Sequence, residues 1–209
     1  MIKTIIADEH PIVFEGLKNI FKKSDIVVTE WAKDGDEIKQ KIKKTNYDVL
    51  LLEISLPGRS GLEVLKQIKK IKPKLPVLIF SLLSEEQYGL RALRAGASGY
   101  LSKEASPDEL KQAIYKVYRG NKYVSPILSE KLAFELDDNA QRNPHDKLSD
   151  REYQVMCMIA SGKSVKQISE ELHLSVKTIS TYLSHIKQKM KMSTNSEITY
   201  YALKQKLVE

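Results

Sequence analysis

The sequence has only one cysteine, Cys157, among its 209 residues. A single cysteine excludes any disulfide bond within the chain, which is typical of proteins of a reducing compartment. No apolar run approaches the roughly 20 residues that a membrane-spanning helix needs. The chain also begins without the basic and apolar segments of a secretory signal. We therefore expect a cytoplasmic protein that does not enter a membrane.

Acidic residues are fewer than basic ones, with 27 Asp and Glu against 34 Lys and Arg, and the formal net charge is +7. The local distribution is more informative than the total. Between Leu172 and Ser196 the chain has four lysines and no acidic residue. Because carboxylates repel phosphate, such an acid-free stretch suits a polyanion such as DNA.

Residues 1–120 alternate between short apolar runs and amphipathic patterns. The expected strands are Ile2–Ala7, Ile26–Trp31, Asp48–Leu52, Pro76–Phe80 and Ser98–Leu101. The expected helices are Ile12–Phe21, Asp36–Lys44, Gly61–Ile71, Glu85–Ala95 and Pro107–Tyr118. The pairs that predict capping boxes at helix starts are Asp34 with Glu37, Ser84 with Gln87 and Ser106 with Glu109. This order predicts an α/β domain with a flavodoxin-like, doubly wound, five-stranded parallel sheet.

The remainder of the chain predicts a linker and a second, smaller domain. Residues 121–146 have linker composition, with a possible helix at 125–136 and a polar stretch without periodicity after it. Residues 147–209 are expected to be all-helical. The residues that mark helix starts there are Ser149, Ser164, Ser175 and Thr194. Two short helices joined by a three-residue turn, with a cationic second helix, are typical of a helix-turn-helix domain.

Charged residues stand directly after three strands of the first domain. Asp8 and Glu9 follow the first strand, Glu53 follows the third and Lys103 follows the fifth. The carboxyl ends of parallel strands meet at one edge of a sheet, so we expect these side chains to share one pocket. Carboxylates that lie together need a cation, and hard oxygen ligands favour Mg²⁺.

These residues carry two resemblances. The first domain resembles the receiver domain of response regulators at Asp8-Glu9, Glu53, Pro57-Gly58, Ser81, Tyr100 and Lys103. The second domain resembles the LuxR-type helix-turn-helix at residues 148–152, 160–162, 166–170 and 176–183. Together, in this order, the two domains resemble the NarL/FixJ class of two-component response regulators.

The receiver resemblance implies roles for the residues of the pocket. Glu53 stands at the phosphoacceptor position. The implied Mg²⁺ ligands are Asp8, Glu9, Glu53 and the backbone carbonyl of Ser55. In the implied switch, Lys103 pairs with a phosphoryl group, the Ser81 hydroxyl turns toward it and Tyr100 moves between exposed and buried positions. The implied partner is a sensor histidine kinase, if phosphorylation is retained.

Glu53 departs from the family, because the phosphoacceptor is normally aspartate. The extra methylene moves the carboxylate by about 1.5 Å, and a misplacement of about 1 Å can cost ~10²-fold in a positioned reaction. We expect Glu53 to mimic or replace the phosphorylated aspartate and to give activity without phosphorylation. Three alternatives stay open: a natural change in a regulator controlled by other means, an engineered substitution, and a purely structural ion pair with Lys103.

The third helix of the second domain is implied to enter the major groove of double-stranded DNA. The residues expected at base edges are Ser180, Thr181 and Ser184. Those expected near phosphates are Lys177, Thr178, His185 and Lys187. The opposite, buried face is expected to contain Val176, Ile179, Leu183 and Ile186. Hydroxyl groups discriminate poorly between bases, so dimerisation or DNA shape is expected to supply the remaining specificity.

We therefore predict a DNA-binding transcriptional response regulator that is not an enzyme and binds DNA as a homodimer. Ile198, Tyr201, Ala202 and Leu207 of the last helix are candidates for the dimer surface, although ordinary core packing explains them equally well. One alternative is a receiver that binds a partner or ligand without phosphotransfer. A Mg²⁺-dependent phosphohydrolase is a second alternative, but the sequence after the first strand lacks the Asp-x-Asp of the dehalogenase-like enzymes.

Overall fold

The computed structural model describes residues 1–135 and 143–208, except for the side chains of residues 134 and 135. Contacts divide the chain into two compact units, Met1–Ala133 and Phe134–Glu209. Most of the polar stretch predicted at 137–144 lies outside the described residues, as does residue 136. The predicted domain boundaries at 120 and 146 stay predictions. No helix of the described residues is long and apolar enough to cross a membrane.

The first unit contains a five-stranded, all-parallel sheet in the order β2-β1-β3-β4-β5, which confirms the predicted fold class. The strands are β1 (Ile2–Ala7), β2 (Ile26–Ala32), β3 (Val49–Leu52), β4 (Val77–Ser81) and β5 (Gly99–Ser102). The helices are α1 (Pro11–Phe21), α2 (Gly35–Lys44), α3 (Gly61–Ile71), α4 (Glu85–Arg94), α5 (Pro107–Tyr118) and α6 (Pro126–Glu135). Helix α6 corresponds to the helix predicted at 125–136.

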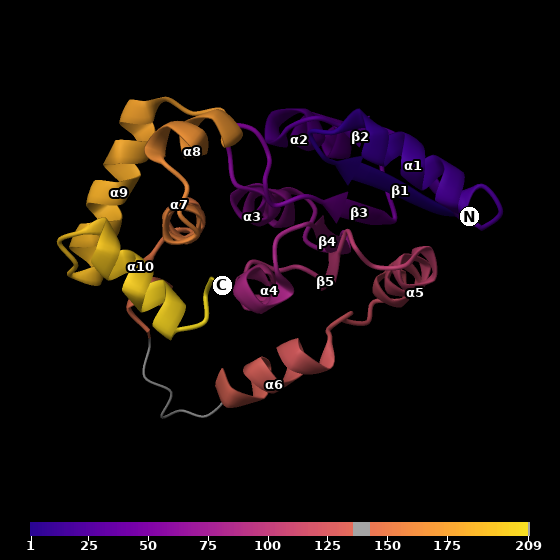
Figure 1. The fold of residues 1–209 in the computed structure, drawn as a ribbon. Helices are drawn as coiled ribbons and strands as arrows, with labels where there is room; N and C mark the ends of the chain where they lie inside the picture. The colour runs from indigo at the N-terminus through magenta and orange to yellow at the C-terminus, as the bar shows by residue number, and fades with distance from the viewer. Residues whose placement is uncertain (136–142, 209) are drawn as a thin grey trace. The chain divides into compact units, whose positions relative to one another are not determined.

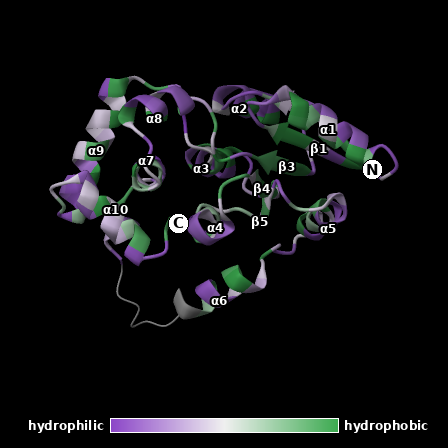
Figure 2. Cartoon of the chain, viewed as in Figure 1, coloured by the Kyte–Doolittle hydropathy of each residue, from purple (hydrophilic) through white to green (hydrophobic). Residues whose placement is uncertain are grey.

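Helices cover both faces of the sheet (Figure 1). On one face, the buried residues of α1 and α5 pack with those of the strands in a single hydrophobic cluster. Every residue of the central strand β3 is fully buried, and the hydropathy colours show apolar strands between helices of mixed character (Figure 2). A sheet covered on both faces requires continuous apolar strands, which is why their positions could be predicted.

The predicted helix starts are largely confirmed, with two differences in detail. At α4 the Ser84 side chain accepts from the backbone N–H of Glu86 rather than from that of Gln87. Ser106 and Glu109 form the reciprocal capping box that opens α5. The Asp34 side chain accepts hydrogen bonds at the start of α2, as predicted. However, the Glu37 carboxylate bonds to the backbone N–H of Lys33 rather than to that of Asp34. The sequence pattern identifies the cap but not which neighbouring N–H the reciprocal bond reaches.

The second unit is helical in its described residues. It contains the 3₁₀ helix η1 (Pro144–Lys147) and the helices α7 (Asp150–Ala160), α8 (Val165–Glu171), α9 (Val176–Met190) and α10 (Asn195–Lys204). Capping boxes open α7 at Ser149 and α8 at Ser164. A short turn joins α8 to α9, and His173 in this turn has a left-handed backbone with φ of 51°. This is the predicted helix-turn-helix.

The prediction of the buried face of α9 is wrong for one residue, Val176. Ile179, Leu183 and Ile186 are buried, but the Val176 residue is 51% exposed. Val176 is the first residue of the helix. Periodicity gives the direction of a helix face, but it does not show where along the helix the packing partner ends.

Two of the residues proposed for a dimer surface belong to the core. Ile198 and Ala202 of α10 are fully buried, and the Tyr201 hydroxyl lies 2.8 Å from Nδ1 of His145. The exposed apolar side of α10 is instead formed by Tyr200, which is 69% exposed, and by Leu203. The alternative of ordinary core packing therefore holds for Ile198 and Ala202.

Candidate functional site

The residues that follow β1, β3 and β5 are held by the sheet itself. The backbone N–H groups of Asp8, Glu53 and Lys103 continue the ladder one residue beyond each strand. They donate to the carbonyl groups of Ala32, Ala7 and Ser81 at 2.9, 3.0 and 2.9 Å respectively. The sheet therefore fixes the starting points of all three side chains at its carboxyl edge.

Lys103 joins the two buried carboxylates of the pocket. Its Nζ atom lies 2.5 Å from Oδ2 of Asp8 and 2.7 Å from Oε2 of Glu53, and the lysine side chain is only 11% exposed. Asp8 and Glu53 are buried as well. One ammonium group therefore neutralises part of the charge of two carboxylates that would otherwise repel each other.

The second oxygen of the Glu53 carboxylate is surrounded by donors. Oε1 accepts from the backbone N–H of Ile54 at 2.6 Å and of Ser55 at 3.0 Å. It also accepts from the hydroxyl of the buried Ser81 at 2.5 Å. With Lys103 on Oε2, both oxygens of the carboxylate are bound by groups that favour a negative charge.

A chain of hydrogen bonds connects Glu53 to a buried tyrosine. The Ser81 hydroxyl donates to Glu53 and accepts from the backbone N–H of Leu83 at 3.1 Å. The carbonyl of Leu83 accepts from the Tyr100 hydroxyl at 2.7 Å. Tyr100 is fully buried in this position. The loop between β4 and α4 is thus tied to both Glu53 and Tyr100.

The charges of the pocket shift two pKa values. Burial alone lowers the pKa of Lys103, but the charge of Glu53 and the contacts with Asp8 and Glu53 outweigh it, so this pKa is raised. Burial raises the pKa of Tyr100, and the negative charge of Glu53 raises it further. The pocket therefore contains an ammonium ion and a neutral phenol at neutral pH.

The predicted Mg²⁺ ligands are brought together only in part. Asp8 and Glu53 converge on one cation, Lys103. However, no group of three or more His, Cys, Asp and Glu side chains suited to a metal ion is found in residues 1–135 and 143–208. Glu9 is partly exposed. The hard oxygens fit Mg²⁺ in their chemistry, and the ammonium group of Lys103 lies where a metal ion would have to compete.

Two residues beside the pocket were not predicted from the sequence. The ring N–H of Trp31, in β2, donates to the carbonyl of Asp8 at 2.6 Å, and the Trp31 ring stacks with Phe14 of α1. Trp31 could have been predicted to lie near the pocket, because it stands near the carboxyl end of β2. Leu83 was missed because it contributes only its backbone, for which a sequence contains no signal.

Gly61 allows the turn after Glu53 to lie against the start of α3. A Cβ atom at this position would lie 2.1 Å from the carbonyl oxygen of Glu53 and 2.7 Å from Cα of Ile54. The N–H of Gly61 also donates to the carbonyl of Ile54 at 2.8 Å. Both clashing atoms belong to the backbone and cannot move aside without moving Glu53.

We therefore expect Gly61→Ala to lower the free energy of unfolding by about 1–3 kcal/mol, because overpacking forces the backbone to shift. Gly16→Ala is the matched control, because no atom lies within 4 Å of a Cβ at that helical position. We expect that control to be neutral or stabilising by roughly 0.5–1 kcal/mol. Urea unfolding of both variants measures the difference, and equal stabilities would contradict this account of Gly61.

In the second unit, the residues predicted to contact DNA lie along α9. Lys177, Ser180, Thr181, Ser184 and His185 are exposed, and Thr178 and Lys187 are half-buried. The Ser180 hydroxyl donates to the carbonyl of Val176, and the Thr181 hydroxyl donates to that of Lys177. In these positions the two hydroxyls offer acceptor lone pairs to the outside.

An acidic residue of α7 lies beside the later turns of α9. Glu152 is buried, and its carboxylate accepts from Nζ of Lys189 at 2.6 and 2.9 Å. Nδ1 of His185 lies 3.7 Å from the same carboxylate. The contacts of Lys189 fix α9 against α7. His185 is exposed, and its ring also lies near the Glu152 carboxylate.

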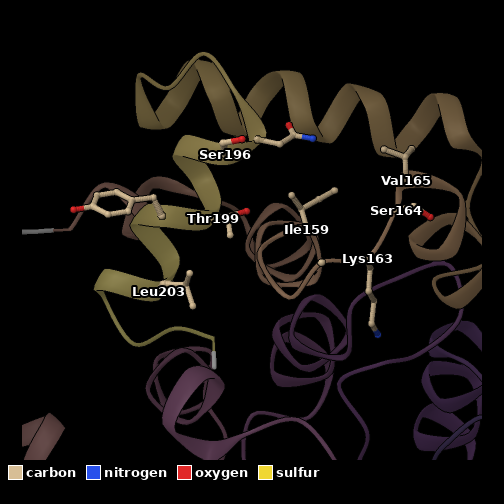
Figure 3. Close-up of a pocket in the computed structure, with 10 residues that line it drawn as sticks. Ile159, Lys163, Ser164, Val165, Ser196, Thr199 and Leu203 are labelled. Carbon is tan, nitrogen blue, oxygen red and sulfur yellow. The ribbon is translucent and has the colours of Figure 1, made fainter.

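A shallow hollow of about 460 Å³ lies in the second unit (Figure 3). It is lined by the end of α7, the start of α8 and one side of α10. Ile159, Thr199 and Leu203 are among its lining residues. The exposed Tyr200 forms part of its rim.

Comparison with known proteins agrees with this division. Residues 4–115 match the model of the response regulator receiver domain, and residues 146–202 match that of the luxR family of bacterial regulatory proteins. The oxygen regulatory protein NreC of Staphylococcus carnosus is 36% identical over 216 residues, and NreC of Staphylococcus aureus is 37% identical. Each alignment covers the whole of both proteins.

Solved structures give the same result. A LuxR-family response regulator from Aurantimonas is 31% identical, with a TM-score of 0.59 over 65% of this chain and 98% of that one. RcsB of Salmonella enterica, bound to the promoter rprA with the phosphomimetic BeF₃⁻, shares the fold at 24% identity. Its TM-score is 0.65 over 96% of this chain and 97% of that one.

Proposed function

Since this chain belongs to the luxR-family response regulators, we propose that Glu53 holds its receiver in the active arrangement without phosphorylation. The family consists of DNA-binding transcription regulators of two-component systems, not enzymes. In the proposed mechanism the Glu53 carboxylate stands in for the oxygens of an aspartyl phosphate. The helix-turn-helix unit then binds its DNA site without a signal from a kinase.

The observation that carries this proposal is the 2.5 Å hydrogen bond from Ser81 to Glu53. The receiver resemblance implies that activation turns this hydroxyl toward the phosphoryl group and turns the tyrosine inward. Here Ser81 points at the glutamate oxygen, and Tyr100 is fully buried. Lys103, which would pair with a phosphoryl group, pairs with Glu53 at 2.7 Å. These contacts of Ser81 and Lys103 and the burial of Tyr100 support the proposal.

Comparison of this chain with Glu53→Asp, in DNA binding and in labelling by acetyl phosphate, tests the proposal. The aspartate variant should depend on phosphorylation, and the glutamate chain should not. Robust labelling of Glu53 itself as an alkali-labile acyl phosphate would defeat the proposal. A regulator in which Glu53 is only a structural partner of Lys103 would bind DNA equally well with either residue.

Receiver domains generally bind Mg²⁺ in their acidic pocket. For this chain we propose that Asp8, Glu9, Glu53 and the carbonyl of Ser55 would hold the ion. The metal would neutralise the carboxylates and draw charge from a phosphoryl group. Because Lys103 already contacts two of these carboxylates, we expect the ion to bind more weakly here than in a receiver with aspartate at this position.

The proposed DNA contacts are those predicted for α9. Ser180, Thr181 and Ser184 lie on its exposed side and would meet base edges. The hydroxyls of Ser180 and Thr181 already donate to backbone carbonyls of α9, so they would act as acceptors toward the bases. An acceptor reads the amino groups of adenine and cytosine in the major groove. Lys177, Thr178, His185 and Lys187 would lie near phosphates. The exposed Val176 adds an apolar side chain that suits a thymine methyl group.

We expect Lys177→Ala to weaken DNA binding similarly for all sequences and to lower the salt slope by about one, because one phosphate contact is lost. The matched control is Lys44→Ala, which removes the same charge from an exposed position on α2 of the receiver. Titrations of a DNA site at several salt concentrations measure both slopes. Equal slopes for the two variants would show that Lys177 does not contact phosphate.

The remaining partners follow from the proposed role. We propose that the chain binds double-stranded DNA as a homodimer and works in the cytoplasm, where bacterial DNA is found. In the DNA-binding unit, we propose that the dimer contact is made by Tyr200 and Leu203 of α10, which are exposed and line the hollow. A cognate sensor histidine kinase is the expected partner of a phosphorylated form, and the Glu53 chain would not need it.

A further inference from the structure

The segment that follows α5 is bonded to the edge of the receiver sheet. Nζ of Lys122 donates to the carbonyl of Ala97 at 2.5 Å. The N–H of Tyr123 donates to the carbonyl of Ser98 at 2.9 Å, and its carbonyl accepts from the N–H of Tyr100 at 3.3 Å. Tyr123 thereby forms a parallel bridge beside β5. The chain leaves the receiver in a fixed position along this edge.

The next segment, α6, docks on α4. The Leu128 side chain is 1% exposed. It lies so close to Gly89 that a Cβ there would come within 3.0 Å of a Leu128 methyl group. Three residues further along, Nζ of Lys131 donates to the carbonyl of Glu86 at 2.8 Å. Because Gly89 has no side chain, Leu128 can pack directly against α4 at this position. We call this contact between Leu128 and Gly89 the seat of Leu128.

The switch and this docked segment share Tyr100. Its hydroxyl bonds to Leu83, the residue before the N-cap of α4, and its backbone N–H bonds to Tyr123. Leu83 in turn donates to Ser81, which bonds to Glu53. An unbroken series of contacts therefore leads from the acidic pocket to the start of α4 and to the segment before α6.

From these contacts we propose that α6 is the output element of the receiver. The state of Glu53, Ser81 and Tyr100 sets the position of α4, and this position determines whether Leu128 stays seated on Gly89. Docked α6 defines where the linker to the DNA-binding unit begins. Released α6 lets that linker begin earlier, near Tyr123. The consequence for DNA binding rests on the proposed function, whereas the coupling of Tyr100 to α6 does not.

Hydrogen exchange of the full-length chain tests the coupling directly. Ser81→Ala and Tyr100→Phe should each speed exchange of the α6 amides about fivefold or more, which is the lower end of usual coupling between sites. Tyr47→Phe is the matched control. It also removes a buried phenol hydroxyl, bonded to Glu30 at 2.6 Å, but it lies outside this series of contacts. Equal exchange in Tyr100→Phe and Tyr47→Phe would overturn the proposal.

A second pair of variants tests the seat itself. Leu128→Ala should release α6 and speed its exchange, whereas Ile127→Ala should not, because the neighbouring Ile127 is 50% exposed. In the Leu128→Ala background, Tyr100→Phe should have no further effect on α6. Additive effects of the two substitutions would show that they act independently and would contradict the coupling.

DNA binding separates this proposal from the proposed function. If Glu53→Asp weakens binding, and does so by the same factor with Leu128 and with Leu128→Ala, Glu53 acts as proposed but α6 is not the output element. If Glu53→Asp has no effect on binding in either background, the proposed function fails. The exchange experiment still decides in that case whether Tyr100 controls α6.

Discussion

Replacing Glu53 with aspartate is expected to weaken DNA binding about tenfold when no phosphoryl donor is present. The shorter side chain withdraws its carboxylate by about 1.5 Å. It therefore cannot keep Lys103, Ser81 and the N–H groups of Ile54 and Ser55 as partners at the observed distances. The apparent affinity falls in proportion to the fraction of receivers in the active arrangement. A fall of that fraction to about one tenth gives the expected factor.

The loss should be reversible in the aspartate variant only. Acetyl phosphate or beryllofluoride with Mg²⁺ should restore its DNA binding, because an aspartate at this position has room for the added group. The glutamate chain should respond to neither. Its carboxylate already has Ser81 and Lys103 as partners, and the added group has no place between them.

Glu15→Asp is the matched control for this experiment. It removes the same methylene from an exposed glutamate of α1, whose partner is Lys18, and it should leave DNA affinity unchanged. Titration of labelled DNA by fluorescence anisotropy at fixed salt concentration compares the three chains. Equal affinities of the unsubstituted chain and the Glu53→Asp variant, with or without beryllofluoride, would contradict a signalling role for Glu53.

The fold could be predicted from the sequence because its signals are local. The strand β3 is recognisable since all its residues are apolar, and the structure buries each of them. Ser106 and Ser149 mark helix starts since the residue three positions later completes each capping box. The convergence of Asp8, Glu53 and Lys103 followed from the topology of a parallel sheet and not from their spacing.

What could not be predicted depends on distances between elements. Periodicity assigned Val176 to the core, but the packing of α9 begins one turn later at Ile179. The hydrogen bond from Tyr100 to Leu83 uses a backbone carbonyl. The contact of Leu128 with Gly89 depends on the absence of a side chain at Gly89. No residue pattern reports either feature.

Lys103→Met is expected to lower the free energy of unfolding by about 3–5 kcal/mol. Removing one partner from a buried ion pair costs this much because the other charge remains buried without compensation. Here two carboxylates are affected, since the ammonium lies 2.5 Å from Asp8 and 2.7 Å from Glu53. Methionine lacks only the terminal nitrogen of the lysine side chain and keeps a similar apolar stem, so lost packing does not explain a loss of this size.

The size of the effect depends on burial, and a surface pair provides the control. Lys111 lies 3.2 Å from Asp108, whose side chain is 84% exposed. Lys111→Met should therefore cost only about 0–1 kcal/mol. Urea unfolding of both variants at neutral pH measures the two costs. If Lys103→Met costs no more than Lys111→Met, the pair of carboxylates is not held by Lys103.

Added Mg²⁺ should then separate the two roles of the lysine. In the Lys103→Met variant the ion no longer competes with an ammonium group for Asp8 and Glu53, so it should recover part of the lost stability. A ligand that binds the folded state alone stabilises it by about 2.7 kcal/mol at one hundred times its dissociation constant. The unsubstituted chain should gain much less at the same Mg²⁺ concentration. An equal gain in both chains would mean that the ion binds away from these carboxylates, since only a shared site makes the lysine and the metal alternatives to each other.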